Sequence, residues 1–250
     1  MKIGLLTTTG LSEFRLDSLK PVLRDKSFSI ALAIIDDSPK KSFVQKIKKN
    51  LKKGRGGYIV IMAFQKLFQK NKIAVGTEKF CDETGIAIYK TKDIYSSESI
   101  SKISESKLDI LLLIDAFGII KEPLLSLTPF GILSYHHGNM RKYRGQPPAF
   151  WELYNNEKEM GITVQILSSG LDCGIAVEEK TITIRKTDTL KKLYDRAMSE
   201  SVNMMYEALK KLNTPGFIPS EIDSYGKVYT IPNLRQWIWF NLKTFWRRIK

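Results

Sequence analysis

The chain has 250 residues, of which 43% are hydrophobic and 26% are charged, an ordinary balance for a globular protein with a real core. Its two cysteines are too few for a disulfide scaffold or a zinc site, and no apolar run approaches the ~20 residues that a membrane-spanning helix needs. The first residues predict a strand and not an export signal, so we expect a cytoplasmic protein.

The net charge of +14 is concentrated in two segments. Residues 40–72 contain eleven basic residues and residues 233–250 contain five, with no acidic residue in either segment. Apolar residues are interleaved with the basic ones, which is typical of amphipathic elements on anionic lipid surfaces. We therefore expect peripheral contact with the inner face of an anionic membrane through both segments. A protein interface is an equal alternative, and a nucleic acid is a weaker one.

Apolar runs and helical spacings predict the secondary structure in chain order. The first half predicts strands at 2–7 and 29–35 around a helix at 15–25, then a basic insertion at 38–73, a strand at 85–89, a helix at 97–106, a strand at 108–114, a helical turn at 123–127 and a strand at 131–136. The second half predicts a helix at 148–155, strands at 161–167 and 175–184, and helices at 189–212 and 234–249.

Strands that alternate with helices predict an α/β protein with a Rossmann-like, mostly parallel sheet flanked by helices. No Gly-x-Gly-x-x-Gly follows a strand and no Walker sequence is present, which argues against a dinucleotide or nucleoside triphosphate site. We expect a catalytic domain over residues 1–212 and a short extension over residues 213–250 that ends in a basic, aromatic, amphipathic helix.

Most of the chemistry that the sequence suggests lies near its two histidines, His136 and His137, at the end of a buried strand. Open α/β sheets bind their ligands at this end of their strands. Asp172 lies on a turn at 168–174, so His136 and Asp172 are candidates for an acid/base pair. Ser134 shares a strand face with His136, whereas His137 points to the other face, because side chains alternate along a strand.

With the motifs around them, these residues resemble the formyltransferase family that takes its one-carbon unit from 10-formyltetrahydrofolate. The resemblance covers roughly residues 108–212 and keeps the order and spacing of Ser134-Tyr-His136, Tyr143-Arg-Gly145, Pro148, Trp151, Gly161-Ile-Thr163 and Leu171-Asp-Cys-Gly174. It implies the formyltransferase fold, 10-formyltetrahydrofolate as co-substrate and transfer of a formyl group to a primary amine. It implies no metal site.

The resemblance also implies a catalytic trio. The family has an asparagine, a histidine and an aspartate, and the corresponding residues here are Ser134, His136 and Asp172. The serine is a departure, because its hydroxyl is a single donor on a shorter arm than an amide. Loss of one donor to a developing oxyanion can cost ~3 kcal/mol of transition-state stabilisation, unless a neighbour such as Asn139 compensates.

The remaining site residues follow from the same resemblance. The folate is expected between a loop and a turn that contain Asp115, Ala116, Phe117, Gly118, Leu171 and Gly174. The substrate is expected near His137, Asn139, Arg144, Gly145 and Thr163. Some of these residues also have structural interpretations. A structural role for His137 is an equal alternative, Arg144 and Gly145 suit a loop anchor, and Trp151 at helical spacing suits the core.

The length of the chain bears on the expected acceptor. Only about 35 residues follow the last long helix predicted before the extension, too few for the extra β-barrel of the tRNA-formylating members. The Tyr-Arg-Gly-x-x-Pro-x-x-Trp pattern favours sugar N-formyltransferases, so we expect the amine of a nucleotide- or lipid-linked amino sugar for surface polysaccharide. Glycinamide ribonucleotide or methionyl-tRNA as acceptor, or a non-catalytic folate- or sugar-binding module, are the alternatives. A homodimer is a further expectation.

Overall fold

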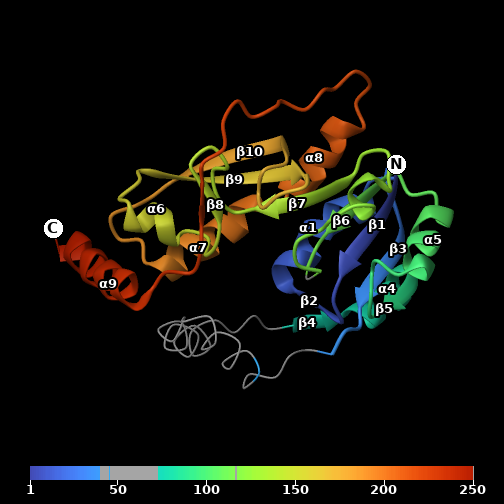
Figure 1. Cartoon of the computed structure of the whole chain (residues 1–250), viewed down its shortest axis with the longest axis horizontal. Helices are drawn as coiled ribbons and strands as arrows, with labels where there is room; N and C mark the ends of the chain where they lie inside the picture. The colour runs from blue at the N-terminus through green and yellow to red at the C-terminus, as the bar shows by residue number, and fades with distance from the viewer. Residues whose placement is uncertain (40–44, 46–72, 116, 250) are drawn as a thin grey trace.

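The computed structural model describes residues 1–39, 45, 73–115 and 117–249. Its main sheet has seven strands in the order β10-β9-β7-β6-β1-β3-β5 (Figure 1). The strands are β1 (Lys2–Thr7), β3 (Ser29–Asp36), β5 (Ala87–Thr91), β6 (Ile110–Leu113), β7 (Ile132–His136), β9 (Glu159–Ile166) and β10 (Ile175–Thr183). All neighbours from β7 to β5 pair parallel, and β9 pairs antiparallel with both β7 and β10. The predicted α/β fold with a mostly parallel sheet is therefore confirmed.

Helices cover both faces of this sheet, because the parallel strands are apolar on both sides. Leu5 of β1 packs in one cluster with residues of α1 (Glu13–Arg24) and α8 (Met204–Leu212). Leu6 points the other way, into a cluster with residues of α5 (Ser97–Glu105) and the 3₁₀ turn η1 (Leu124–Ser126). The other helices are α4 (Thr77–Thr84), α6 (Phe150–Tyr154), α7 (Leu190–Ser201) and α9 (Leu234–Ile249).

The helix predicted at 189–212 is wrong as a single element, because it is divided into α7 and α8. The hydroxyl of Tyr135 on β7 bonds backbone groups on both sides of the division. It donates to the carbonyl of Ser201, the last residue of α7, at 2.9 Å, and accepts from the backbone N–H of Met205 in α8 at 3.0 Å. One side chain thus satisfies backbone groups at both helix ends that would otherwise be unpaired. The apolar stripe continues through this break, so periodicity alone does not reveal it.

Two small sheets and one helix were not predicted. β2 (Gly10–Ser12) pairs antiparallel with β4 (Ile73–Gly76), and β8 (Tyr143–Gly145) pairs parallel with β11 (Lys227–Tyr229). These strands have three or four residues, and α4 has eight, which is too short for a clear periodic pattern. The predicted basic insertion at 38–73 lies almost entirely outside the described residues.

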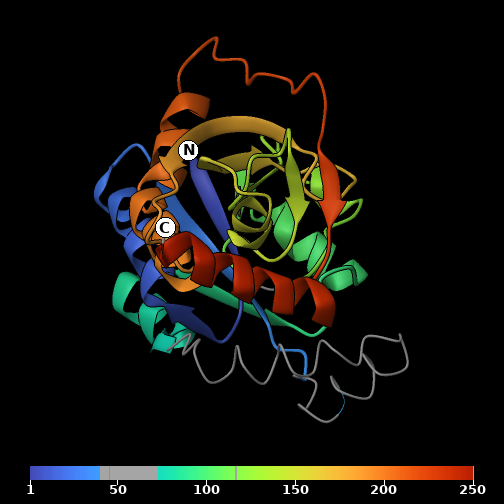
Figure 2. The same cartoon turned by 90° about the vertical axis from the view of Figure 1, so that its left-hand side faces the viewer.

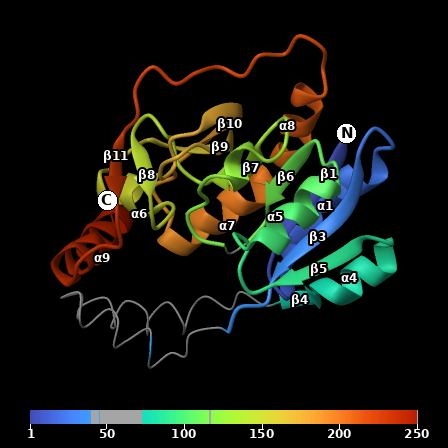
Figure 3. The same ribbon diagram turned by 45° about the vertical axis from the view of Figure 1, so that its right-hand side comes forward.

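The segment after α8 returns along the molecule to the side that holds β8. In Figure 3 it runs from α8 over the top of the structure to β11, which lies beside β8. Trp151 is buried there, and its indole N–H donates to the carbonyls of Gln146 and Thr230. The prediction that Trp151 belongs to the hydrophobic core is therefore confirmed. The α9 helix follows and lies across the face that is turned towards the viewer in Figure 2.

Candidate active site

His136 and Asp172, 36 positions apart in the chain, meet at the edge of the sheet. His136 is the last residue of β7 and is buried, with 6% of its surface exposed. Its Nδ1 lies 3.4 Å from Oδ2 of Asp172, and its Nε2 lies 2.8 Å from the carbonyl oxygen of Tyr143. Both partners are acceptors, so the ring can bond both only when each of its nitrogens carries a proton. The imidazole ring is thus oriented by one oxygen on each side, and the carboxylate lies at its Nδ1.

The Asp172 carboxylate is held from two sides. Its Oδ2 accepts a 2.8 Å hydrogen bond from the N–H of Gly145, and its Oδ1 lies 3.5 Å from Nε2 of Gln165. Asp172 has a φ of 46°, a left-handed conformation that aspartate tolerates better than most residues. Its side chain is 19% exposed against 7% for His136, so the pair is open to solvent mainly on the aspartate side.

Gln165 is a supporting residue that the sequence did not reveal. It lies on β9 directly opposite Ser134 and is buried. While its amide nitrogen approaches Asp172, its Oε1 accepts a 2.9 Å hydrogen bond from the N–H of Gly174. The side chain therefore connects both ends of the Asp172–Gly174 turn to the sheet. The sequence signal that could have identified Gln165 is its position two residues after Thr163, on the same strand face.

The turn requires glycine at position 174. A Cβ added there would lie 1.9 Å from the Ile166 carbonyl oxygen and 2.8 Å from Oε1 of Gln165. We expect Gly174→Ala to destabilise the fold by about 2 kcal/mol, because the backbone must move to relieve this overlap. Urea unfolding measures the change. The matched variant Gly76→Ala, whose added Cβ meets nothing within 4 Å, should change stability little; equal stability of the two variants would contradict the prediction.

The predicted folate-binding residues lie at the same edge as the His136–Asp172 pair. β6 neighbours β7, and the loop that follows it contains Asp115, Phe117 and Gly118; Ala116 lies outside the described residues. Phe117 and Gly118 have left-handed backbones, with φ values of 52° and 65°. Leu171 on the Asp172 turn is exposed. The loop thus begins at the end of β6 next to β7, and the turn contains Asp172 itself.

Ser134 shares the His136 face of β7 and is partly buried. Its Oγ contacts the Tyr135 carbonyl oxygen at 3.5 Å, the limit of a hydrogen bond. The hydroxyl is thus weakly engaged. Its role as a donor in place of the family's asparagine stays a prediction.

His137 lies on the opposite face of β7, away from the His136–Asp172 pair. Its ring stacks on Tyr135 with centroids 5.4 Å apart, and its Nε2 lies 3.2 Å from Oγ of Ser201 on α7. Burial lowers the pKa of His137 to about 3, with further lowering by the nearby charges of Arg15 and His136. This environment is that of a neutral packing residue and does not place His137 beside the predicted substrate.

The other predicted substrate residues make hydrogen bonds that hold the loop over His136. Arg144 Nε donates to the Gly226 carbonyl at 2.7 Å, and its guanidinium lies over the Tyr225 ring. Thr163 donates to the Gly138 carbonyl at 3.3 Å. Arg144 thus acts as the loop anchor, and the N–H of Gly145 contacts Asp172 directly. Substrate contacts of these residues stay predictions.

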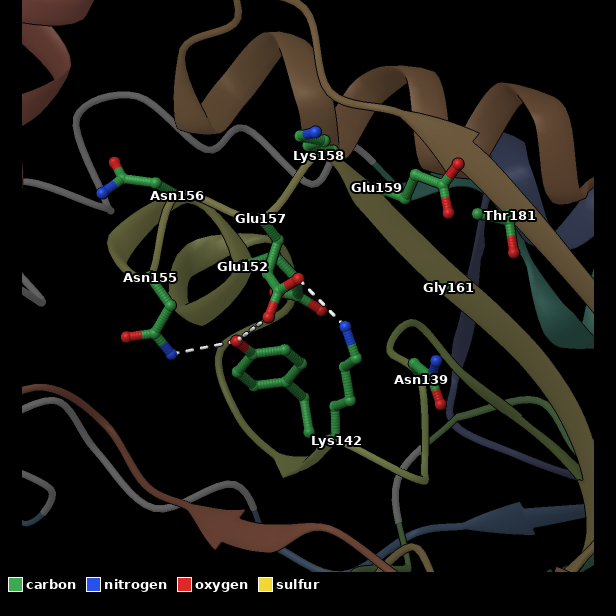
Figure 4. A pocket seen from close by; sticks show the side chains of 11 residues that line it. Asn139, Lys142, Glu152, Asn155, Asn156, Glu157, Lys158, Glu159, Gly161 and Thr181 are labelled. Carbon is green, nitrogen blue, oxygen red and sulfur yellow. Dashed lines mark hydrogen bonds and ion pairs between the residues drawn. The ribbon is translucent and has the colours of Figure 1, made fainter.

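Asn139 lies in a separate polar cavity of about 560 Å³, lined by Lys142, Tyr143, Glu152, Glu157 and their neighbours (Figure 4). Neither His136 nor Asp172 lines it. The Asn139 Oδ1 accepts from the N–H of Arg141 at 2.9 Å, so the side chain caps a turn. It is therefore not placed to compensate for the missing asparagine at position 134.

Tyr143 connects this cavity with the His136–Asp172 pair. Its carbonyl oxygen contacts His136. Its hydroxyl donates to Glu157 at 2.8 Å and accepts from Asn155 at 3.0 Å, and dashed lines mark these two contacts beside the labelled Glu157 and Asn155 in Figure 4. Burial raises the pKa of the adjacent Glu152 to about 7, and the charge of Glu157 adds to this effect. The Tyr143 carbonyl is therefore fixed by side-chain contacts on the far side of the loop.

Comparison with known sequences decides the family. The sequence profile of the family described as formyl transferase matches residues 30–209, well over half of the chain. The chain belongs to the formyl transferase family. The matched range includes His136, Asp172 and all the motifs on which the resemblance depends, so the predicted family is confirmed.

Curated formyl transferases with similar sequences act on methionyl-tRNA according to their names. The methionyl-tRNA formyltransferase of Caldanaerobacter subterraneus subsp. tengcongensis is 28% identical over 141 residues, which are 56% of this chain and 45% of that protein. The chain spans about half the length of the curated relatives it matches. These relatives therefore share the formyl transferase region and leave the acceptor open.

Solved formyl transferases with other acceptors share the fold. Glycinamide ribonucleotide transformylase 1 of Symbiobacterium toebii has a TM-score of 0.60 at 16% identity and covers 89% of this chain and 94% of its own. The N-formyltransferase of Helicobacter canadensis, described in complex with folinic acid and dTDP-3-aminofucose, has a TM-score of 0.60 at 14% identity over 92% of this chain and 71% of its own. At these identities the likeness shows the fold alone, and it agrees with the formyl transferase architecture described above.

Proposed function

We propose that the protein transfers a formyl group from 10-formyltetrahydrofolate to the primary amine of an amino sugar that is linked to a nucleotide or a lipid. The observation that carries the proposal is the contact of His136 with Asp172 at the edge of the sheet, beside the loop after β6. This arrangement supplies an acid and a base within one small region, as transfer of an acyl group to an amine requires.

The reaction needs two aids from the protein. The amine nitrogen attacks the formyl carbon, the bond from that carbon to N10 of the folate breaks, and the amine loses a proton while N10 gains one. Asp172, the more exposed member of the pair, accepts through water the proton that the amine nitrogen loses once it has bonded to the formyl carbon. His136 donates to the oxygen on which negative charge develops.

His136 must give up one of its present contacts before it can donate to the formyl oxygen. Its two ring nitrogens contact Tyr143 and Asp172 in the structure. One of these N–H groups must exchange its protein acceptor for the formyl oxygen as the transition state forms. Ser134, on the same strand face and weakly hydrogen-bonded, is the further donor that we propose for this oxygen.

The described residues fit a folate beside the pair. The loop after β6 has two consecutive left-handed residues, Phe117 and Gly118, and successive backbone N–H groups in tight turns form concave ligand sites in many proteins. Leu171 is exposed across from it and offers an apolar wall. We propose that Asp115, Phe117, Gly118, Leu171 and Gly174 hold the folate. Folate-bound structures of family members with this fold support the co-substrate.

The amino sugar as acceptor is supported by a structural neighbour described with an amino-sugar nucleotide and by the sequence pattern from Tyr143 to Trp151. The basic segments suit a substrate that carries phosphate. Methionyl-tRNA is the second candidate, because the curated relatives with similar sequences are named for it and because the net charge of +14 would favour a nucleic acid.

An acceptor panel tests this proposal. The purified full chain is incubated with 10-formyltetrahydrofolate and, separately, amino-sugar nucleotides, glycinamide ribonucleotide and charged initiator tRNA. We expect mass spectrometry to show the gain of one formyl group on an amino-sugar nucleotide, and no gain with His136→Ala. Formylation of tRNA alone would select the second candidate. Folate binding without transfer to any acceptor would instead indicate a binding module.

A further inference from the structure

The α9 helix has an apolar face that stays exposed among the residues the structure describes. Its exposed residues follow helical spacing along one side, and each has at least 40% of its surface accessible: Leu234, Ile238, Trp239, Leu242, Phe245 and Trp246. An exposed Trp or Phe is unremarkable alone, but six neighbouring apolar residues on one helix form a continuous patch, which marks an interaction surface.

Contacts on the opposite side of α9 hold the helix on the protein with this apolar face outward. Phe240 is buried, and both Trp237 and Phe240 pack on Phe150, with ring centroids at 5.7 Å and 4.5 Å. Lys243 donates to the Tyr154 carbonyl at 2.9 Å, and Arg247 donates to the Asp188 carbonyl. Aromatic stacking and two hydrogen bonds from cationic side chains therefore hold α9 on the protein.

The α9 helix differs from an ordinary surface helix, because it is apolar on its outer side as well as on the side that packs on the protein. An ordinary amphipathic helix buries its apolar residues and exposes its charges. Here two of the cations bond protein carbonyls, whereas Trp239, Phe245 and Trp246 face outward. A partner that covers this face must therefore offer apolar groups to it, as the acyl chains just below the head groups of a bilayer do.

The positive charge of the chain favours an anionic lipid surface over a second copy of the chain as the partner of α9. The segment 233–250 has five basic residues and no acidic one, and the whole chain carries +14. Two copies would bring like charges together, whereas an anionic bilayer would attract this segment. Tryptophan also suits the boundary between acyl chains and head groups, because its ring is apolar and its N–H is polar.

We propose that the exposed face of α9 binds the surface of an anionic membrane, with the helix lying in the plane of the head groups. The helix has 16 residues, about 24 Å at 1.5 Å per residue, and none of the helices in the described ranges has the length and apolarity to cross a bilayer. This inference rests on α9 alone and holds whichever amine the protein formylates.

Vesicle flotation with the full chain tests the proposal. Vesicles contain phosphatidylcholine alone or phosphatidylcholine with phosphatidylglycerol. We expect the wild-type chain to float with the anionic vesicles only, and Trp239→Ser/Trp246→Ser to lower its partition coefficient roughly tenfold or more. The matched variant Ile218→Ser/Val228→Ser, which removes exposed apolar residues outside α9, should bind as the wild type does. Far-UV circular dichroism checks that each variant is folded.

Three results would overturn the proposal. The wild-type chain could fail to float with anionic vesicles. It could float equally well after both tryptophans are replaced, which would place lipid binding elsewhere. Finally, sedimentation could show a wild-type dimer that becomes a monomer in the tryptophan variant without a change in lipid binding, and α9 would then be an interface between two copies.

Discussion

Replacing Asp172 by asparagine is expected to lower kcat/KM for formyl transfer roughly 10³-fold, because the carboxylate that accepts the amine proton is lost. The substitution is nearly isosteric, and the asparagine oxygen can still accept from the N–H of Gly145, which now lies 2.8 Å from Asp172. Asparagine also tolerates the φ of 46° at this position. The turn should therefore keep its conformation while the base is removed. Initial rates of product formation, with urea unfolding beside them, measure both effects.

The matched control for this variant is Asp82→Asn, which changes an exposed aspartate on α4. It removes the same charge from the chain far from the candidate site and should leave kcat/KM within about twofold of wild type. If Asp172→Asn were equally active, the proposed role of Asp172 in proton transfer would be wrong.

Acid is expected to destabilise the folded chain through His137. Burial and the charges of Arg15 and His136 lower its pKa from 6.5 to about 3 in the folded state. Above pH 6.5 the residue is neutral in both states and has no effect on stability. Below pH 6.5 the unfolded chain takes up a proton that the folded chain does not, which costs about 1.4 kcal/mol per pH unit. The loss reaches about 3 kcal/mol by pH 4 and ends near pH 3.

The variant His137→Gln isolates this contribution, because its amide can still bond Ser201 and does not titrate. Guanidinium unfolding of both chains at pH 7 and pH 4 gives the comparison, in which the contributions of all other groups cancel. We expect the variant to lose about 3 kcal/mol less than the wild type between these two values. An identical loss in both chains would show that His137 is protonated in the folded state.

Sequence patterns predicted the parts of the fold that depend on local apolar runs and on motif order. The strand that ends at His136, the strand that ends at Ile166 and the long α9 helix all lie within two residues of their predicted bounds. The antiparallel register that sets Thr163 opposite His136 and Gln165 opposite Ser134 then decides which side chains meet. A one-dimensional pattern does not contain that register.

Other parts of the site depend on contacts between distant segments. The Tyr143 carbonyl meets His136 because the loop after β7 folds back over the strand end. Tyr135 bonds backbone groups on both sides of the division in the predicted helix at 189–212, because its hydroxyl reaches across from the sheet. Asn139 follows the same motif as His136, yet it caps a turn in the neighbouring cavity. Residue type and spacing identified these residues as polar and near the site without indicating their partners.

The most direct measurement for the central claim is a double-variant cycle on kcat/KM for the preferred acceptor, with His136→Ala, Asp172→Asn and the combined variant. If the imidazole and the carboxylate act as one unit in formyl transfer, the combined variant should be hardly slower than the worse single variant. Losses that multiply, so that the combined variant falls by the product of the two single effects, would show that the two groups act independently and would contradict the proposed pair.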